Sequence, residues 1–125
     1  MAPPTKMDAH QLTEEGHYGV CGAAGARMEM PGCSLCMGNQ AQVKEGATVM
    51  STSTRNFPNR LGKNTNVYLG SAELSAICSK LGRIPSKEEY LADIGVINQN
   101  GDKIYKYMNF DQIAEFKEVA DGVTA

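Results

Sequence analysis

Short strand-like runs that alternate with helical segments predict an α/β fold with a mostly parallel sheet and flanking helices. Residues 47–52 and 66–69 are short runs with β-branched and aromatic side chains, as expected of strands. Between residues 71 and 82, apolar side chains recur at helical spacing instead. With 125 residues and 42% apolar content, the chain has the size of one ordinary domain or of part of a larger one.

The first third of the chain is predicted to hold an extended end, one helix and one short strand. Residues 2–4 include two prolines, which lack amide donors and restrict the residues before them. Thr13 is a suitable N-cap for a helix that continues through Cys21 and ends by Gly25. Residues 27–30 are expected to form a strand, which the Pro-Gly pair after them cuts short.

The remaining elements follow from local signals. The strand at 66–69 ends at Gly70, and the next helix ends near Gly82. Ser86 and the Glu89 three residues later fit a capping box that opens a further helix. After a turn at residues 100–101, a marginal strand is expected at 104–107. A last helix, ending at Gly122, would carry Ile113, Phe116 and Ala120 on one face.

Charge and hydropathy exclude several general classes of function. A net charge of −2 gives no overall attraction to nucleic acid or anionic membranes, although a local basic loop can still bind an anion. The longest apolar runs are only a few residues, so we expect no membrane span. No secretory signal is visible at residues 1–11, and we therefore expect a cytoplasmic protein without a disulfide framework.

Cys33 and Cys36 form a close pair of thiols in a turn with glycines at 32 and 38. Cysteine thiolates bind Zn²⁺, Cu(I) and iron–sulfur clusters, and this spacing lets both sulfurs face one centre. The glycines permit tight backbone turns whose amides can donate to sulfur. From the pair alone, a cluster site, a redox dithiol, half of a zinc site and two unpaired core thiols all remain open.

The zinc and redox interpretations are the weaker ones. A zinc site normally takes four ligands in two close pairs, and the chain has no second pair. A redox dithiol would open a helix after the first strand of its fold, which this turn does not do. Cys21 and Cys78 stand alone in helical stretches and are expected to fill the core.

A second group of polar residues spans 51–60 and includes Arg55 and Arg60. The planar guanidinium of arginine binds a carboxylate through two parallel hydrogen bonds, which lysine cannot do. Two arginines around a Phe-Pro turn would therefore suit a polycarboxylate ligand. The alternative is a solvated loop whose arginines pair with surface acids. Phe57 is expected to anchor the loop.

Three motifs carry a resemblance to a known family. Residues 31–40 read Pro-Gly-Cys-Ser-Leu-Cys-Met-Gly-Asn-Gln, residues 46–49 read Gly-Ala-Thr-Val, and residues 51–62 read Ser-Thr-Ser-Thr-Arg-Asn-Phe-Pro-Asn-Arg-Leu-Gly. Together they closely resemble the bacterial aconitases of the B type (aconitate hydratase 2). Shorter matches at 2–5, 11–16, 71–74, 88–90 and 109–110 extend the resemblance over nearly the whole chain.

The resemblance implies that residues 1–125 are the C-terminal part of a cluster-binding domain in a longer enzyme. That enzyme would interconvert citrate and isocitrate through cis-aconitate on a [4Fe–4S] cluster held by three cysteines. Cys33 and Cys36 match two of these ligands, and the third lies in family sequence that this chain lacks. Arg55 and Arg60 match arginines that bind the carboxylates of the tricarboxylate substrate. No catalytic base is assigned, because the family's serine base also lies outside these residues.

The resemblance therefore implies that the chain works with the remaining aconitase domains and is inert alone. It also permits RNA binding by a cluster-free form, for which the acidic composition gives little support. The non-enzymatic alternative is a small metal- or redox-binding module that uses Cys33 and Cys36. The aconitase interpretation requires the cysteine turn and the arginine loop to lie on the same side of the fold.

Overall fold

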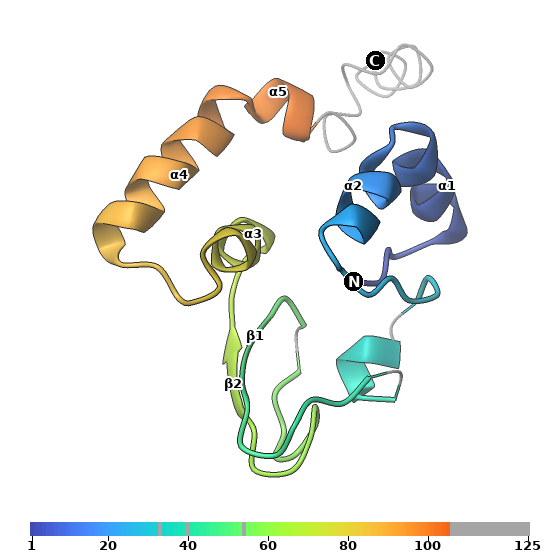
Figure 1. Cartoon of the computed structure of the whole chain (residues 1–125), viewed down its shortest axis with the longest axis vertical. Helices are drawn as coiled ribbons and strands as arrows, with labels where there is room; N and C mark the ends of the chain where they lie inside the picture. The colour runs from blue at the N-terminus through green and yellow to red at the C-terminus, as the bar shows by residue number, and fades with distance from the viewer. Residues whose placement is uncertain (33, 40, 54, 106–125) are drawn as a thin grey trace, which may run out of the picture. The chain divides into compact units, whose positions relative to one another are not determined.

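A computed structural model describes residues 1–32, 34–39, 41–53 and 55–105 (Figure 1). The chain divides into two compact units, Met1–Ser71 and Ala72–Ala125. The first unit holds two helices, a 3₁₀ turn and two strands, and the described part of the second unit is helical. The predicted α/β class is confirmed, because helices accompany a small parallel sheet.

The first unit opens with a pair of helices, α1 (Lys6–Glu14) and α2 (His17–Ala23). α1 begins at the N-cap Thr5, whose side chain and that of Asp8 form a reciprocal capping box. Gly16, at φ +80°, separates the two helices. The prediction that a helix starts at Thr13 is therefore wrong in its starting residue. Thr13 instead lies near the end of α1, and its hydroxyl donates to the carbonyl of Ala9.

Residues 27–30 do not form the predicted strand. Their segment lies beside the first residues of the chain, where the amide of Glu29 donates to the carbonyl of Met1 at 2.8 Å. The amide of Gly32 donates to the carbonyl of Pro3 at 3.1 Å. Prolines at 3 and 4 have no amide to return, so a regular ladder cannot form there. The prediction of a strand is wrong for this reason.

Strands β1 (Thr48–Ser51) and β2 (Asn66–Leu69) form a parallel pair in the first unit. Both were predicted, and their parallel pairing confirms the predicted strand orientation. Thr48 is opposite Asn66 and Ser51 is opposite Leu69. The connection between them, residues 52–65, carries the arginines of interest. The β2 ladder therefore fixes the end of β1, from which this connection starts.

The second unit contains α3 (Ala72–Leu81), α4 (Lys87–Gln99) and the short α5 (Gly101–Ile104). The capping box of Ser86 and Glu89 opens α4 as predicted. The strand predicted at 104–107 is wrong at residues 104 and 105, and the rest of it lies outside the described residues. Gly101–Ile104 is helical, because the carbonyl of Asn100 accepts from the amides of Lys103 and Ile104 at 3.1 Å each. The last predicted helix lies outside the described residues.

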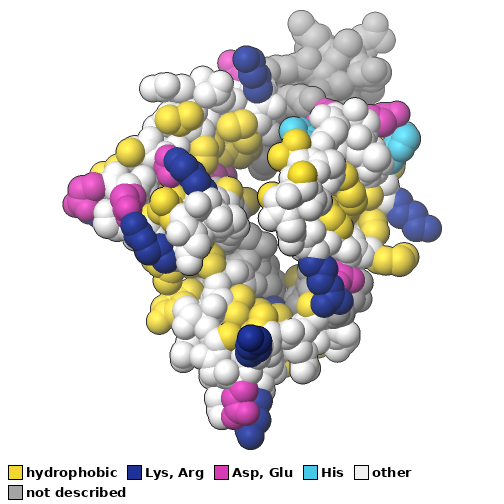
Figure 2. All heavy atoms as spheres, viewed as in Figure 1, with side chains coloured by type: hydrophobic (Ala, Val, Ile, Leu, Met, Phe, Trp, Pro, Cys, Tyr) yellow, Lys and Arg dark blue, Asp and Glu magenta, His cyan; other side chains and the backbone are white. Residues whose placement is uncertain are grey.

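Apolar side chains are only partly enclosed within the chain. Among the large apolar side chains of the described residues, Leu61 and Ile77 are buried. Many others are exposed, and Figure 2 shows them as yellow side chains on the visible face. Cys21 and Cys78 are half-buried, so neither is a fully enclosed core residue as predicted. In the described part of the chain, no helix is both long and apolar enough to cross a membrane.

Candidate functional site

The cysteine turn is a 3₁₀ helix, η1 (Ser34–Met37), which follows the Pro-Gly pair at 31–32. Cys36 is carried on η1 and is half-buried. The turn leaves η1 through Gly38, whose φ of +73° lies in the region that favours glycine. Cys33 lies outside the described residues. The structure therefore places one member of the predicted thiol pair.

Gly38 is buried against the backbone of the arginine loop. A Cβ atom built on Gly38 would lie 1.7 Å from the carbonyl oxygen of Arg60 and 2.9 Å from its carbonyl carbon. Real Cβ atoms do not approach other atoms so closely, so only glycine fits without a backbone shift. The segment that carries the thiol and the loop that carries the arginine are therefore in direct contact.

The side chain of Arg60 strengthens this contact. Its Nη1 donates to the backbone carbonyl of Cys36 at 3.1 Å, and its Nη2 donates to the Oγ of Ser51 at 3.1 Å. Arg60 is only 3% exposed. Burying a guanidinium is costly unless hydrogen bonds compensate for the lost water. The two bonds to oxygen provide such compensation, and they join the cysteine turn to the end of β1.

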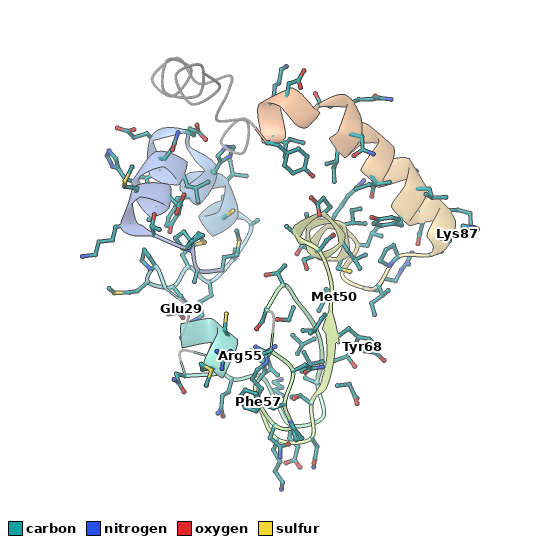
Figure 3. All side chains as sticks on the ribbon, turned by 180° about the vertical axis from the view of Figure 1, so that it is seen from behind. Glu29, Met50, Arg55, Phe57, Tyr68 and Lys87 are labelled. Atoms are coloured by element: carbon teal, nitrogen blue, oxygen red, sulfur yellow. The ribbon has the colours of Figure 1, made fainter. Side chains whose placement is uncertain are left out.

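Arg55 lies on the same loop and, unlike Arg60, is exposed. Figure 3 labels Arg55 and Phe57 on the connection between the two strands. The amide of Arg55 donates to the Oγ of Ser53 at 3.3 Å, which helps to fix the backbone where its side chain begins. An exposed guanidinium keeps its planar set of donors accessible to an anion.

Asparagine side chains shape the loop beyond Arg55. The side-chain amide of Asn56 donates to the carbonyl of Val67 on β2, at 3.2 Å. Asn59 and Asn64 both adopt positive φ, and the Oδ1 of Asn59 accepts from the amide of Asn64 at 2.8 Å. Phe57 is 43% exposed and lines a depression with Tyr68 of β2, and its role as an anchor of the loop stays a prediction.

The donor set suits one side of a thiolate-bound metal centre. Cys36 carries a thiol, the donor type that iron–sulfur clusters use, on a turn whose carbonyl accepts a hydrogen bond from Arg60. No group of three or more metal-ligating side chains is found within the residues that the structure covers. Among the described residues of this turn, Cys36 alone offers a thiolate, so the turn can supply one ligand of a cluster and not a complete ligand set.

Comparison with known proteins agrees with this geometry. The sequence model of the Aconitase family (aconitate hydratase) matches residues 1–82, which include the cysteine turn, the arginine loop and both strands. The chain belongs to the aconitase family. The match covers well over half of the chain, and it includes every described residue of the candidate site.

Individual members of the aconitase family are similar over nearly the whole chain. Aconitate hydratase B of Pseudomonas aeruginosa is 67% identical over 120 residues, covering 96% of this chain. The aconitate hydratases B of Synechocystis sp. and Escherichia coli are 60% and 58% identical over 120 and 123 residues, covering 94% and 98% of this chain. The chain spans about 14% of the length of each of these relatives.

The structure thus brings together Cys36 and Arg60, places Arg55 on the same loop and leaves Cys33 undescribed. Sequence reasoning missed Ser51 and the contact of Gly38 with Arg60. Ser51 is the last residue of β1 and the first of the polar run, which is a recognisable position for a hydroxyl acceptor. No local signal could have revealed that Gly38 meets Arg60, because the two residues are distant in sequence.

Proposed function

We propose that the chain is part of the iron–sulfur domain of an aconitate hydratase. The complete protein would interconvert citrate and isocitrate through cis-aconitate. The observation that carries the proposal is the hydrogen bond of buried Arg60 to the carbonyl of Cys36. It unites a soft-metal turn with a loop of anion-binding residues, as an enzyme acting on a polycarboxylate at a metal cluster requires. Membership in the aconitase family and the names of the relatives support the same proposal.

In this proposal, Cys33 and Cys36 are two of the cysteines that hold a [4Fe–4S] cluster. When bound, such a cluster with one open iron supplies a Lewis acid for the loss and return of water. The chain contributes the thiolates and the fixed backbone of η1. The third cysteine ligand and the base would come from other domains of the same protein.

Arg55 and Arg60 are proposed to serve the carboxylates of the substrate. A tricarboxylate carries several negative charges that need compensation when it leaves water. Arg55 is exposed on the loop, so its planar donors can form two parallel hydrogen bonds with one carboxylate. Such pairing fixes the orientation of the substrate as well as balancing its charge. Arg60 adds a buried positive charge beside the same turn.

The isolated chain is proposed to be inactive, because it holds at most two cluster ligands of the predicted pair and no assigned base. After anaerobic reconstitution with iron and sulfide, the 125-residue chain alone should show no hydration of cis-aconitate. Measurable turnover from this chain alone would contradict the assignment of the missing groups to other domains.

A chimeric enzyme provides the direct test of function. The segment of Pseudomonas aeruginosa aconitate hydratase B that matches this chain would be replaced by the chain itself. The chimera should bind iron, show visible thiolate-to-iron absorption and convert citrate to isocitrate. Cys33→Ser and Cys36→Ser should each abolish the absorption and the activity. Cys78→Ser, which changes a half-buried thiol on α3, is the matched control and should retain both.

The outcomes separate the two functional classes. Loss of activity in the chimera with intact folding would contradict the hydratase proposal. Stoichiometric zinc without iron would favour a structural metal site, and a reversible thiol–disulfide couple without metal would favour the redox module.

A further inference from the structure

We infer that Arg60 is a positioning residue that holds the cysteine turn in the geometry needed to bind the cluster. This inference rests on the proposed function, since it assigns a role within the same site. It goes beyond substrate binding, because it gives Arg60 a second role, on the backbone of Cys36.

The first step of the argument is the rigidity of the backbone that carries Arg60. The amide of Val43 donates to the carbonyl of Leu61 at 2.7 Å, and the amide of Gly46 donates to that of Lys63 at 3.0 Å. Gly62 lies so close to the carbonyl of Val43 that an added Cβ would approach it to 2.7 Å. Residues 43–46, which follow the cysteine turn, are therefore tightly packed against residues 61–63.

The second step is the direction in which the Arg60 side chain extends from this backbone. Its guanidinium reaches across to the carbonyl of Cys36, a residue 24 positions earlier in the sequence. The Oγ of Ser51 receives the second donor, and the same oxygen also accepts from the amide of Ser53 at 3.2 Å. Arg60 therefore connects the turn to β1, which is paired with β2.

The third step is energetic. Hydrogen bonds from a charged donor contribute more than neutral ones, and a planar guanidinium holds two acceptors in a fixed relation. The main-chain carbonyl of Cys36 belongs to the residue that carries the thiol, so fixing this carbonyl limits the positions of Cys36. A lysine at position 60 would retain the charge but offer no such fork.

The test uses the chimeric enzyme in its cluster-free form. Peptide mass spectrometry measures the rate at which iodoacetamide alkylates each cysteine. The proteins compared are the parent, Arg60→Gln, Arg60→Lys and Ser51→Ala. We expect Cys36 to react about tenfold faster in Arg60→Gln, because loss of a hydrogen bond from a charged donor frees the turn. Arg60→Lys and Ser51→Ala should give intermediate rates. Removal of a positive charge disfavours the reactive thiolate, so charge alone predicts the opposite change.

Two controls make the result specific. Cys21, half-buried on α2 in the same unit, reports general unfolding in the same sample and should keep its parent rate. Arg55→Gln removes the exposed arginine of the same loop and should leave the Cys36 rate unchanged. In the iron-loaded chimera, a chelator should also remove the visible absorption about tenfold faster from Arg60→Gln than from the parent. The factor is the same because the same hydrogen bond is lost.

Each outcome decides the inference. An unchanged Cys36 rate in Arg60→Gln, with only a raised KM for citrate, would overturn it and leave Arg60 as a substrate contact. An equal increase at Cys21 would also overturn it, since Arg60 would then support the fold in general. If the chimera shows no turnover but the order of Cys36 rates is as expected, the positioning role stands and the proposed function fails.

Discussion

Replacing Gly38 by alanine tests the contact between the cysteine turn and the arginine loop. The added Cβ would lie 1.7 Å from the carbonyl oxygen of Arg60, so the two backbones must separate. Overpacking of this kind costs about 1–3 kcal/mol. Alanine at φ +73° adds about 1–2 kcal/mol for the left-handed conformation. The expected total destabilisation of the Gly38→Ala variant is therefore about 2–5 kcal/mol.

Gly46→Ala is the matched control, because it isolates the steric part of this cost. Gly46 has nearly the same φ, +72°, but no heavy atom lies within 4 Å of its added Cβ. It should therefore lose only the conformational part, about 1–2 kcal/mol. The difference between the two variants, about 1–3 kcal/mol, corresponds to a factor of about 5 to 150 in a local opening equilibrium.

Hydrogen–deuterium exchange in the chimeric enzyme measures this factor directly. The amides of Val43, Arg60 and Gly62, all hydrogen-bonded around the contact, are the reporters. They should exchange about 5 to 150 times faster in Gly38→Ala than in Gly46→Ala. The cluster absorption should also be less persistent in Gly38→Ala. Equal exchange in the two variants would refute the reasoning, since the overlap with Arg60 would then carry no cost.

Two further predictions concern the helical unit. Hydrogen bonds from Arg83 and from the amide of Ser86 lower the pKa of Glu89 from 4.5 to about 2. Its carboxylate therefore stabilises the fold fully above pH 4.5, and this contribution is lost as the pH falls toward 2. Circular dichroism of the chain should show a helicity loss in this window, and Glu89→Gln should lack it. If the parent and Glu89→Gln lose helicity over the same pH range, the Glu89 interaction is not the cause of the helicity loss. Tyr105 donates to Glu73, which raises the pKa of Tyr105 above 10.0, so this stabilisation is present below pH 10 and is lost at higher pH. In Tyr105→Phe, the amides of α5 should undergo hydrogen–deuterium exchange faster at pH 7 than in the parent. An unchanged exchange rate would count against the contact between Tyr105 and Glu73.

The sequence predicted those elements whose signals are local. β1 and β2 have the composition of strands, and α4 begins at the capping box that Ser86 and Glu89 announce. The start of α1 has a local signal in the capping-box spacing of Thr5 and Asp8, which the prediction of a helix start at Thr13 missed. The strand predicted at 104–107 is wrong at its described residues, 104 and 105, because a short alternation of side chains is a weak signal. The carbonyl of Asn100 instead starts a helical turn there.

The candidate site was predictable in its chemistry and only partly in its geometry. Cysteine thiolates are typical metal ligands and arginine side chains typical carboxylate partners, so the sequence alone suggests these roles as hypotheses. The different surroundings of Arg55 and Arg60 could not be inferred, since both occupy the same polar run. Arg55 is exposed, whereas Arg60 is 3% exposed and donates hydrogen bonds to Cys36 and Ser51.

The sequence by itself determined the family, the positions of the thiols and arginines that are candidates for metal and anion binding, and the elements that begin or end at local caps. These features depend on the side chains present and on neighbours within a few residues. Only the tertiary structure decided that Gly38 meets Arg60 and that the guanidinium of Arg60 holds the carbonyl of Cys36. Burial and hydrogen bonding between residues more than 20 positions apart depend on how the whole unit packs, which no short stretch of sequence specifies.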